Sequence, residues 1–164
     1  VYRLDPAPAH VPDKLETGTQ NHEGIAGVGG AIDFIASLGE GSSRREKLAN
    51  AMQTIEAHEA DLADRFRAGL QDLPGVRLYA APEGVRKTPT IAFTVEEFST
   101  EEVCVRMLEH GFFVAAGDFY ASTVAERLGI KDSGGFVRAG LAPYNTQEEV
   151  ETFVATLENV VSER

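Results

Sequence analysis

Two segments of the sequence carry residue types that bind anions. The first is the loop at residues 15–21, where the Gly18 amide and the Thr19 hydroxyl precede a predicted helix. Such donors suit a phosphate or a carboxylate, because a helix N-terminus carries partial positive charge. The same residues also suit a plain capping loop, and the residue types alone favour that simpler interpretation.

The second segment contains Arg138, which lies inside the apolar stretch 134–142 that predicts a strand. Alternation along a strand places Arg138 on one face with Phe136 and Gly140. We expect this guanidinium to have a partner, because an unpaired buried charge is very costly. A carboxylate held by paired hydrogen bonds is the natural partner. Spacing alone does not decide between an acid of the chain and the carboxylate of a ligand.

A third segment, residues 115–120 (AAGDFY), follows a predicted strand and is a candidate edge of an active site, although its residue types alone support this weakly. The single cysteine, Cys104, lies beside core positions of a predicted helix and is interpreted as an inert buried thiol. The histidines are scattered, and the sequence has no zinc-binding spacing, P-loop or GxSxG motif, so we predict no metal site.

Hydrophobic periodicity predicts the elements that must position these residues. Helices are predicted at 22–38, 43–72, 100–110, 119–129 and 146–162, and strands at 76–81, 90–95, 112–116 and 134–142. This order predicts an α+β (α/β-type) fold, with a small antiparallel or mixed sheet of about four strands and helices on one face. The proline-rich residues 1–21 are predicted to form an extended arm before a domain at 22–164.

Composition excludes several classes of function. The 164 residues include 15 Lys and Arg against 26 Asp and Glu, for a net charge of −11. Such an acidic surface repels phosphate backbones and disfavours nucleic-acid binding. No apolar run approaches the roughly 20 residues needed to span a bilayer, so no membrane partner is predicted. A single cysteine excludes an internal disulfide and fits a reducing, cytoplasmic location.

Two long segments resemble a known family. The segment KLETGTQNHEGIAGVGGAIDFIASLG (14–39) resembles the stretch after the cofactor lysine in class V aminotransferases, a group that includes the cysteine desulfurases. The segment VRAGLAPYNTQEEVETFVATL (137–157) resembles the C-terminal signature of the same family. The order of elements between them also matches, so the resemblance covers nearly the whole chain. The pattern is most like the branch named cysteine desulfurase-like proteins.

The resemblance implies a fold-type I enzyme that uses pyridoxal 5'-phosphate, acts on an amino acid and forms a homodimer. Residues 22–164 would be its smaller, C-terminal domain, and residues 1–21 would lead out of the larger cofactor-binding domain. In the family, a Gly-Thr loop reaches the cofactor phosphate of the other subunit, and this role maps onto Gly18 and Thr19. An arginine of the C-terminal strand holds the substrate carboxylate, and this role maps onto Arg138.

The sequence departs from the family at two points. None of its four lysines follows a His in a Ser/Gly-rich loop, as the cofactor lysine of the family does. We therefore expect this chain to be inactive alone and to be a fragment of a longer protein. In addition, Tyr120 stands at the approximate position of the desulfurase cysteine, and a phenol cannot carry sulfur as a persulfide. Transamination, epimerisation, β-elimination or selenocysteine-type lyase chemistry remain open.

Two alternatives belong to other classes of protein. One is a non-catalytic regulatory or assembly module with the same small-domain fold, which would use the glycine-rich helix at 22–38 and the acidic surface for protein contacts. The other is an ACT-like amino-acid sensor. The predicted order of helices and strands differs from the βαββαβ order of ACT domains, so this alternative is less favoured.

Overall fold

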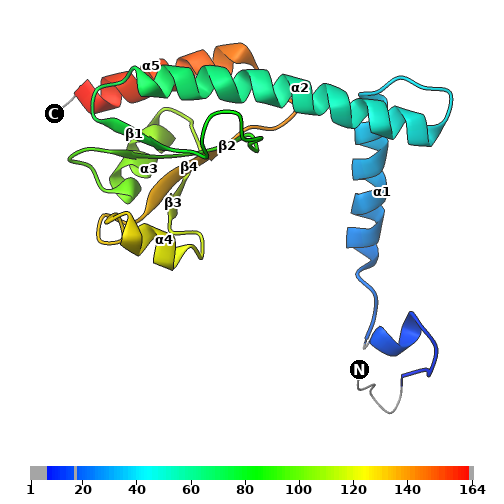
Figure 1. The fold of residues 1–164 in the computed structure, drawn as a ribbon. Coiled ribbons are helices and arrows are strands. Elements are labelled where there is room, and N and C mark those ends of the chain that lie inside the picture. The colour runs from blue at the N-terminus through cyan, green and yellow to red at the C-terminus, as the bar shows by residue number, and fades with distance from the viewer. Residues whose placement is uncertain (1–6, 17, 163–164) are drawn as a thin grey trace. The chain divides into compact units, whose positions relative to one another are not determined.

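The computed structural model describes residues 7–16 and 18–162. Contacts divide the chain into two compact units, Val1–Thr54 and Ile55–Arg164. Helix α2 (Arg44–Gln71) contributes residues to both units (Figure 1). The predicted division into an arm at 1–21 and a domain at 22–164 depends on a larger partner domain and stays a prediction.

The first unit contains a short 3-10 helix η1 (Asp13–Leu15), helix α1 (His22–Ser37) and the start of α2. Helix α1 begins where the sequence predicts, because the Asn21 side chain accepts a hydrogen bond from the Gly24 amide at 2.8 Å. None of its residues is buried. Its exposed large apolar side chains include Ile25 and Val28, which are 61% and 60% exposed. An apolar helix face of this kind is typical of a surface that another element covers.

The second unit is built on an antiparallel sheet of four strands, as the described residues define it, in the order β1-β2-β4-β3. The strands are β1 (Val76–Tyr79), β2 (Thr90–Val95), β3 (Ala115–Gly117) and β4 (Phe136–Gly140). Strand β4 lies between β2 and β3 and bonds to both. The predicted small sheet is confirmed.

The main core lies between one face of this sheet and three helices, namely α2, α3 (Thr100–Glu109) and α5 (Gln147–Ser162). Its aromatic centre is Phe153, whose ring packs edge-on against Phe66 at 4.8 Å and Phe112 at 5.1 Å between ring centroids. Edge-to-face packing of this kind is favourable beyond the apolar area that it buries. The alternate strand residues Val137 and Ala139 of β4 belong to this core.

A second, smaller cluster lies on the opposite face of the sheet, because its β4 member, Phe136, alternates with the strand's main-core residues. It includes Ala125 of the short helix α4 (Ser122–Arg127), and in Figure 1 α4 lies on the side of the sheet away from α5. The fold class predicted from the sequence is confirmed, with α4 as an addition on the second face.

Strand β3 and helix α4 are shorter than predicted, for local reasons. The segment predicted as a strand at 112–116 starts inside the turn that ends α3, because the Phe112 amide donates to the Met107 carbonyl at 3.0 Å. The helix predicted at 119–129 cannot include Phe119 and Tyr120, whose φ angles are +50° and +65°. Positive φ values do not occur in a right-handed helix.

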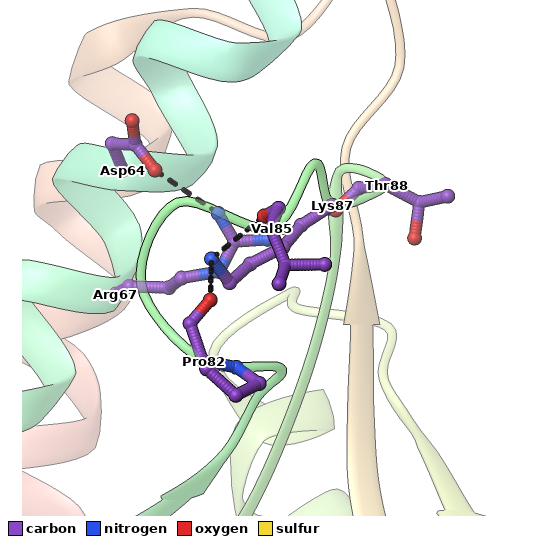
Figure 2. Close-up of polar contacts among 6 residues, drawn as sticks. All are labelled: Asp64, Arg67, Pro82, Val85, Lys87 and Thr88. Atoms are coloured by element: carbon purple, nitrogen blue, oxygen red, sulfur yellow. Dashed lines mark hydrogen bonds and ion pairs between the residues drawn. The ribbon is translucent and has the colours of Figure 1, made fainter.

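Two cationic side chains hold the connection between β1 and β2, as Figure 2 shows. Lys87 donates through Nζ to the carbonyls of Pro82 at 3.1 Å and Val85 at 3.0 Å. Arg67 of α2, whose side chain is only 14% exposed, donates to the Thr88 carbonyl at 2.9 Å and pairs with Asp64 at 3.1 Å. These contacts fix the chain just before β2 begins.

Carboxylates hold the first turns of helices α3 and α5. Ser99 and Glu102 form a capping box at α3, in which the Glu102 carboxylate accepts from the Ser99 hydroxyl at 2.7 Å and the Ser99 amide at 2.8 Å. These two bonds hold the pKa of Glu102 below its usual value of 4.5. At α5, bonds from the Asn145 side chain and the Thr146 amide lower the pKa of Glu149 in the same way.

We expect Arg67→Met to lower the free energy of unfolding of the chain by about 1–3 kcal/mol, because it removes charge-assisted donors while keeping most of the side-chain volume. Urea unfolding measures this. Arg65→Met is the matched control, because Arg65 is 49% exposed and pairs with Asp61 on the surface of the same helix. Equal losses in the two variants would contradict the assigned role of Arg67.

We expect the stability of the chain to fall on acidification. Glu102 and Glu149 have pKa values below 4.5 in the folded chain. Their contribution to the free energy of unfolding is therefore complete above pH 4.5 and is lost as the pH falls through these folded pKa values. The double variant Glu102→Gln/Glu149→Gln should flatten the pH dependence of the urea midpoint below pH 4.5. The exposed Glu109→Gln serves as the control, and an unchanged slope in the double variant would refute the assignment.

Candidate functional site

Arg138 occupies the middle of β4, directly opposite Ala92 of β2 and Ala115 of β3. Both cross-strand neighbours have short side chains, and Arg138 is exposed. The expectation that this arginine is a buried charge is therefore wrong. It lies on the same sheet face as Phe136 and the smaller cluster, as the predicted alternation requires. Within the described residues, no carboxylate forms an ion pair with it.

The contact that Arg138 does make is with an aromatic ring. Its guanidinium carbon lies 3.9 Å from the ring centroid of Phe119, within the range of a cation–π interaction. Phe119 is half-buried and packs against the smaller cluster through its other contacts. The sequence analysis placed Phe119 in the candidate edge at 115–120 but did not predict its contact with Arg138. That contact depends on a strand register that the sequence does not reveal.

The loop that carries Phe119 has an unusual backbone. Phe119 and Tyr120 are consecutive non-glycine residues in the left-handed region, which costs roughly 1–2 kcal/mol for each residue. Asp118 holds them there, because its carboxylate accepts from the Tyr120 amide at 3.0 Å and from the Ser122 hydroxyl at 2.5 Å. The same bonds, that from Ser122 with the larger effect, hold the pKa of Asp118 below its usual value of 3.8.

A backbone contact fixes the loop beside the start of β4. A Cβ atom on Gly135 would lie 2.6 Å from the carbonyl carbon of Gly117, and Gly135 has a φ of +85°. Only glycine fits both conditions. The buried Thr100 holds the turn just before Gly135, because its hydroxyl donates to the Gly134 carbonyl at 3.0 Å. The loop and β4 therefore form one closely packed substructure.

The structure separates the cysteine from this loop. Tyr120 lies at the loop tip with a fully exposed side chain. Cys104 lies on α3 and packs against the main core, on the opposite face of the sheet from Arg138. Burial, with a smaller contribution from the negative charge of Glu101, raises the pKa of the Cys104 thiol above 9.0. Because the thiolate is the nucleophile, these surroundings favour an unreactive thiol.

Gly18 and Thr19 lie in the first unit, in an exposed bend before α1, whereas Arg138 and Tyr120 lie in the second. Thr17 lies outside the described residues. The cap of α1 is Asn21, the last residue of this loop, so the structure agrees with the capping interpretation at Asn21, while Gly18 and Thr19 take no part in the side-chain cap. Among the described residues, nothing would lie within 4 Å of a Cβ atom on Gly18. Exposed amide and hydroxyl donors before a helix N-terminus fit a phosphate group.

The described residues contain no group of three or more His, Cys, Asp or Glu side chains that could hold a metal ion. No helix among them is both long enough and apolar enough to cross a membrane.

Comparison with known proteins points to one family. The family model described as aminotransferase class-V matches residues 6–153. An uncharacterized protein of Mycobacterium tuberculosis (strain CDC 1551 / Oshkosh) is 35% identical over 148 residues, which cover 89% of this chain and 36% of that protein. A cysteine desulfurase of Synechococcus elongatus (strain ATCC 33912 / PCC 7942 / FACHB-805) is 31% identical, over 94% of this chain and 21% of that protein.

The fold gives the same result. The apo structure of a cysteine desulfurase from Thermococcus onnurineus NA1 matches with a TM-score of 0.76 at 28% identity, over 93% of this chain and 34% of that chain. This chain thus spans at most 36% of the length of these relatives. The family match covers most of the chain and agrees with the fold and with the two segments that resemble the family, so the chain belongs to the class V aminotransferase family.

Proposed function

We propose that this chain is the C-terminal domain of a longer enzyme that uses pyridoxal 5'-phosphate to act on an amino acid. The chain spans 36% or less of the length of the relatives compared above, which supports a longer parent enzyme. The apolar face of α1 supports it as well, because a larger domain would cover the exposed Ile25 and Val28. The lysine that holds the cofactor would belong to that larger domain, and the chain alone would be inactive.

Arg138 is proposed to bind the substrate carboxylate. The observation that carries this role is a guanidinium at the centre of the sheet that is exposed and, among the described residues, has no acidic partner. Arginine presents planar donors that match a carboxylate with two parallel hydrogen bonds. The expectation of a carboxylate partner is thus retained, with the carboxylate supplied by the ligand.

Gly18 and Thr19 are proposed to bind the cofactor phosphate of the partner subunit in a homodimer. Their exposed amide and hydroxyl groups are suitable donors, and Asn21 already caps the helix behind them. When bound, pyridoxal 5'-phosphate supplies an electron sink for bonds at the α-carbon of an amino acid. The single cysteine supports a reducing, cytoplasmic location for the enzyme.

The proposed chemistry excludes persulfide formation by the usual desulfurase route. Tyr120 stands at the approximate position of the nucleophilic cysteine, and its phenol cannot accept sulfur. Cys104 is not a substitute, because it lies on the other face of the sheet and its thiol pKa is raised. Transamination, epimerisation, β-elimination and selenocysteine-type lyase chemistry are the reactions proposed for this site.

A second candidate is the non-catalytic assembly module, which the same exposed apolar face of α1 supports. Reduction with borohydride followed by an intact mass separates the two. We expect the full-length protein to gain the mass of a pyridoxyl-phosphate group and this chain to gain nothing. No gain on the full-length protein would reject the enzyme and favour the assembly module.

We expect Arg138→Gln in the full-length enzyme to raise the KM for its amino-acid substrate by about 10- to 100-fold, because a charge-assisted pair contributes about 1.5–3 kcal/mol. Cofactor content, measured by absorbance, should stay unchanged. Arg77→Gln is the control, since Arg77 is an exposed arginine of β1 that lies over the Tyr79 ring at 5.2 Å. If both variants raise KM equally, Arg138 has no special role.

A further inference from the structure

We propose that Phe119 is a positioning residue for Arg138: its ring covers one face of the guanidinium and directs the edge of that group toward the substrate carboxylate. This inference rests on the proposed role of Arg138. It assigns a function to the loop after β3 that depends on Phe119 and not on the residue at the position of the desulfurase cysteine.

The geometry of the contact supports this role. The Arg138 guanidinium carbon lies 3.9 Å from the Phe119 ring centroid, the shortest of the arginine–aromatic contacts seen among the described residues. The others are 4.9 Å for Arg106 over Phe98 and 5.2 Å for Arg77 over Tyr79. A ring over the guanidinium face leaves the N–H donors available, because these donors point outward in the plane of the group.

The ring is held from behind before any ligand arrives. Phe119 packs against the cluster formed by Ala125, Ile130 and Phe136. Phe136 is itself fixed by edge-on packing against Tyr79, with 5.1 Å between the ring centroids. Because the ring cannot move away easily, a stacked Arg138 loses fewer conformations when it binds a carboxylate.

The backbone of the loop indicates that the position of the ring is maintained at a cost. Phe119 itself has a φ of +50°, and the Asp118 carboxylate and the close approach of Gly135 hold the loop in this conformation. Strained conformations persist only where the surrounding structure determines them, and they concentrate at functional sites. A role limited to filling the small cluster would not require the ring to lie over the guanidinium.

The first test observes the stacking directly in the full-length protein. The NMR signal of the Arg138 side-chain Nε–H group, assigned by its loss in Arg138→Gln, should show an upfield ring-current shift. Phe119→Leu should abolish this shift, while Phe119→Tyr should retain it. Absence of the shift in the unsubstituted protein overturns the proposal without the need for any variant.

The second test measures carboxylate binding with propanoate, an unreactive monocarboxylate, in the same protein. Phe119→Leu should weaken propanoate binding and raise the substrate KM by about 2- to 5-fold, as expected for an exposed cation–π contact. Since the ring touches no reacting atom, kcat should be unchanged, and Phe119→Tyr should restore the affinity. Phe113→Leu is the control, because Phe113 is an aromatic residue just before β3 and its side chain is 87% exposed.

A double-mutant cycle separates this inference from the proposed function. If Phe119 acts through Arg138, Phe119→Leu should have no further effect on propanoate affinity once Arg138→Gln is present. An equal effect in both backgrounds would mean that Phe119 acts through packing, which overturns the inference and leaves the role of Arg138 intact. If Arg138→Gln alone leaves propanoate affinity unchanged, the proposed function itself fails at this residue.

Discussion

The pairing of β4 with a strand on each side determines most of what the second unit can do. This pairing fixes the register that sets Ala92 and Ala115 beside Arg138. Because side chains alternate along a strand, a shift of one residue would bury the guanidinium and expose Val137. The position of the candidate carboxylate-binding group is therefore set by the same hydrogen bonds that hold the sheet together.

The hydrophobic core enforces that register. Val137 and Ala139 of β4 pack with Phe93 and Leu157 in the main core, so any slip would place apolar groups in water. Earlier in the chain, the connection held by Arg67 and Lys87 leads into β2, whose first residue pairs with the last residue of β4. Contacts on the main-core face thus help to set the geometry of the opposite face, where the arginine is exposed.

The sequence predicts the long helices and the fold class well, because apolar periodicity and capping residues are local signals. It predicts β3 and α4 poorly. The start of β3 depends on the turn that ends α3, and the start of α4 depends on the positive φ values of Phe119 and Tyr120, which Asp118 and the distant Gly135 stabilise. The same reasoning identifies Arg138 but misjudges its burial, since the alanines beside it are known only once the register is known. The roles of Gly18 and Thr19 stay predictions.

The loop after β3 combines a fixed backbone with a free tip. Its conformation depends on the Asp118 carboxylate, the Tyr120 amide and the absence of a side chain at Gly135, whereas the phenol of Tyr120 is fully exposed. Replacement of that side chain would leave the bonds that shape the loop in place. A fold built in this way can acquire a different reactive group at one position without rebuilding its scaffold, so relatives with the same architecture can carry out different reactions.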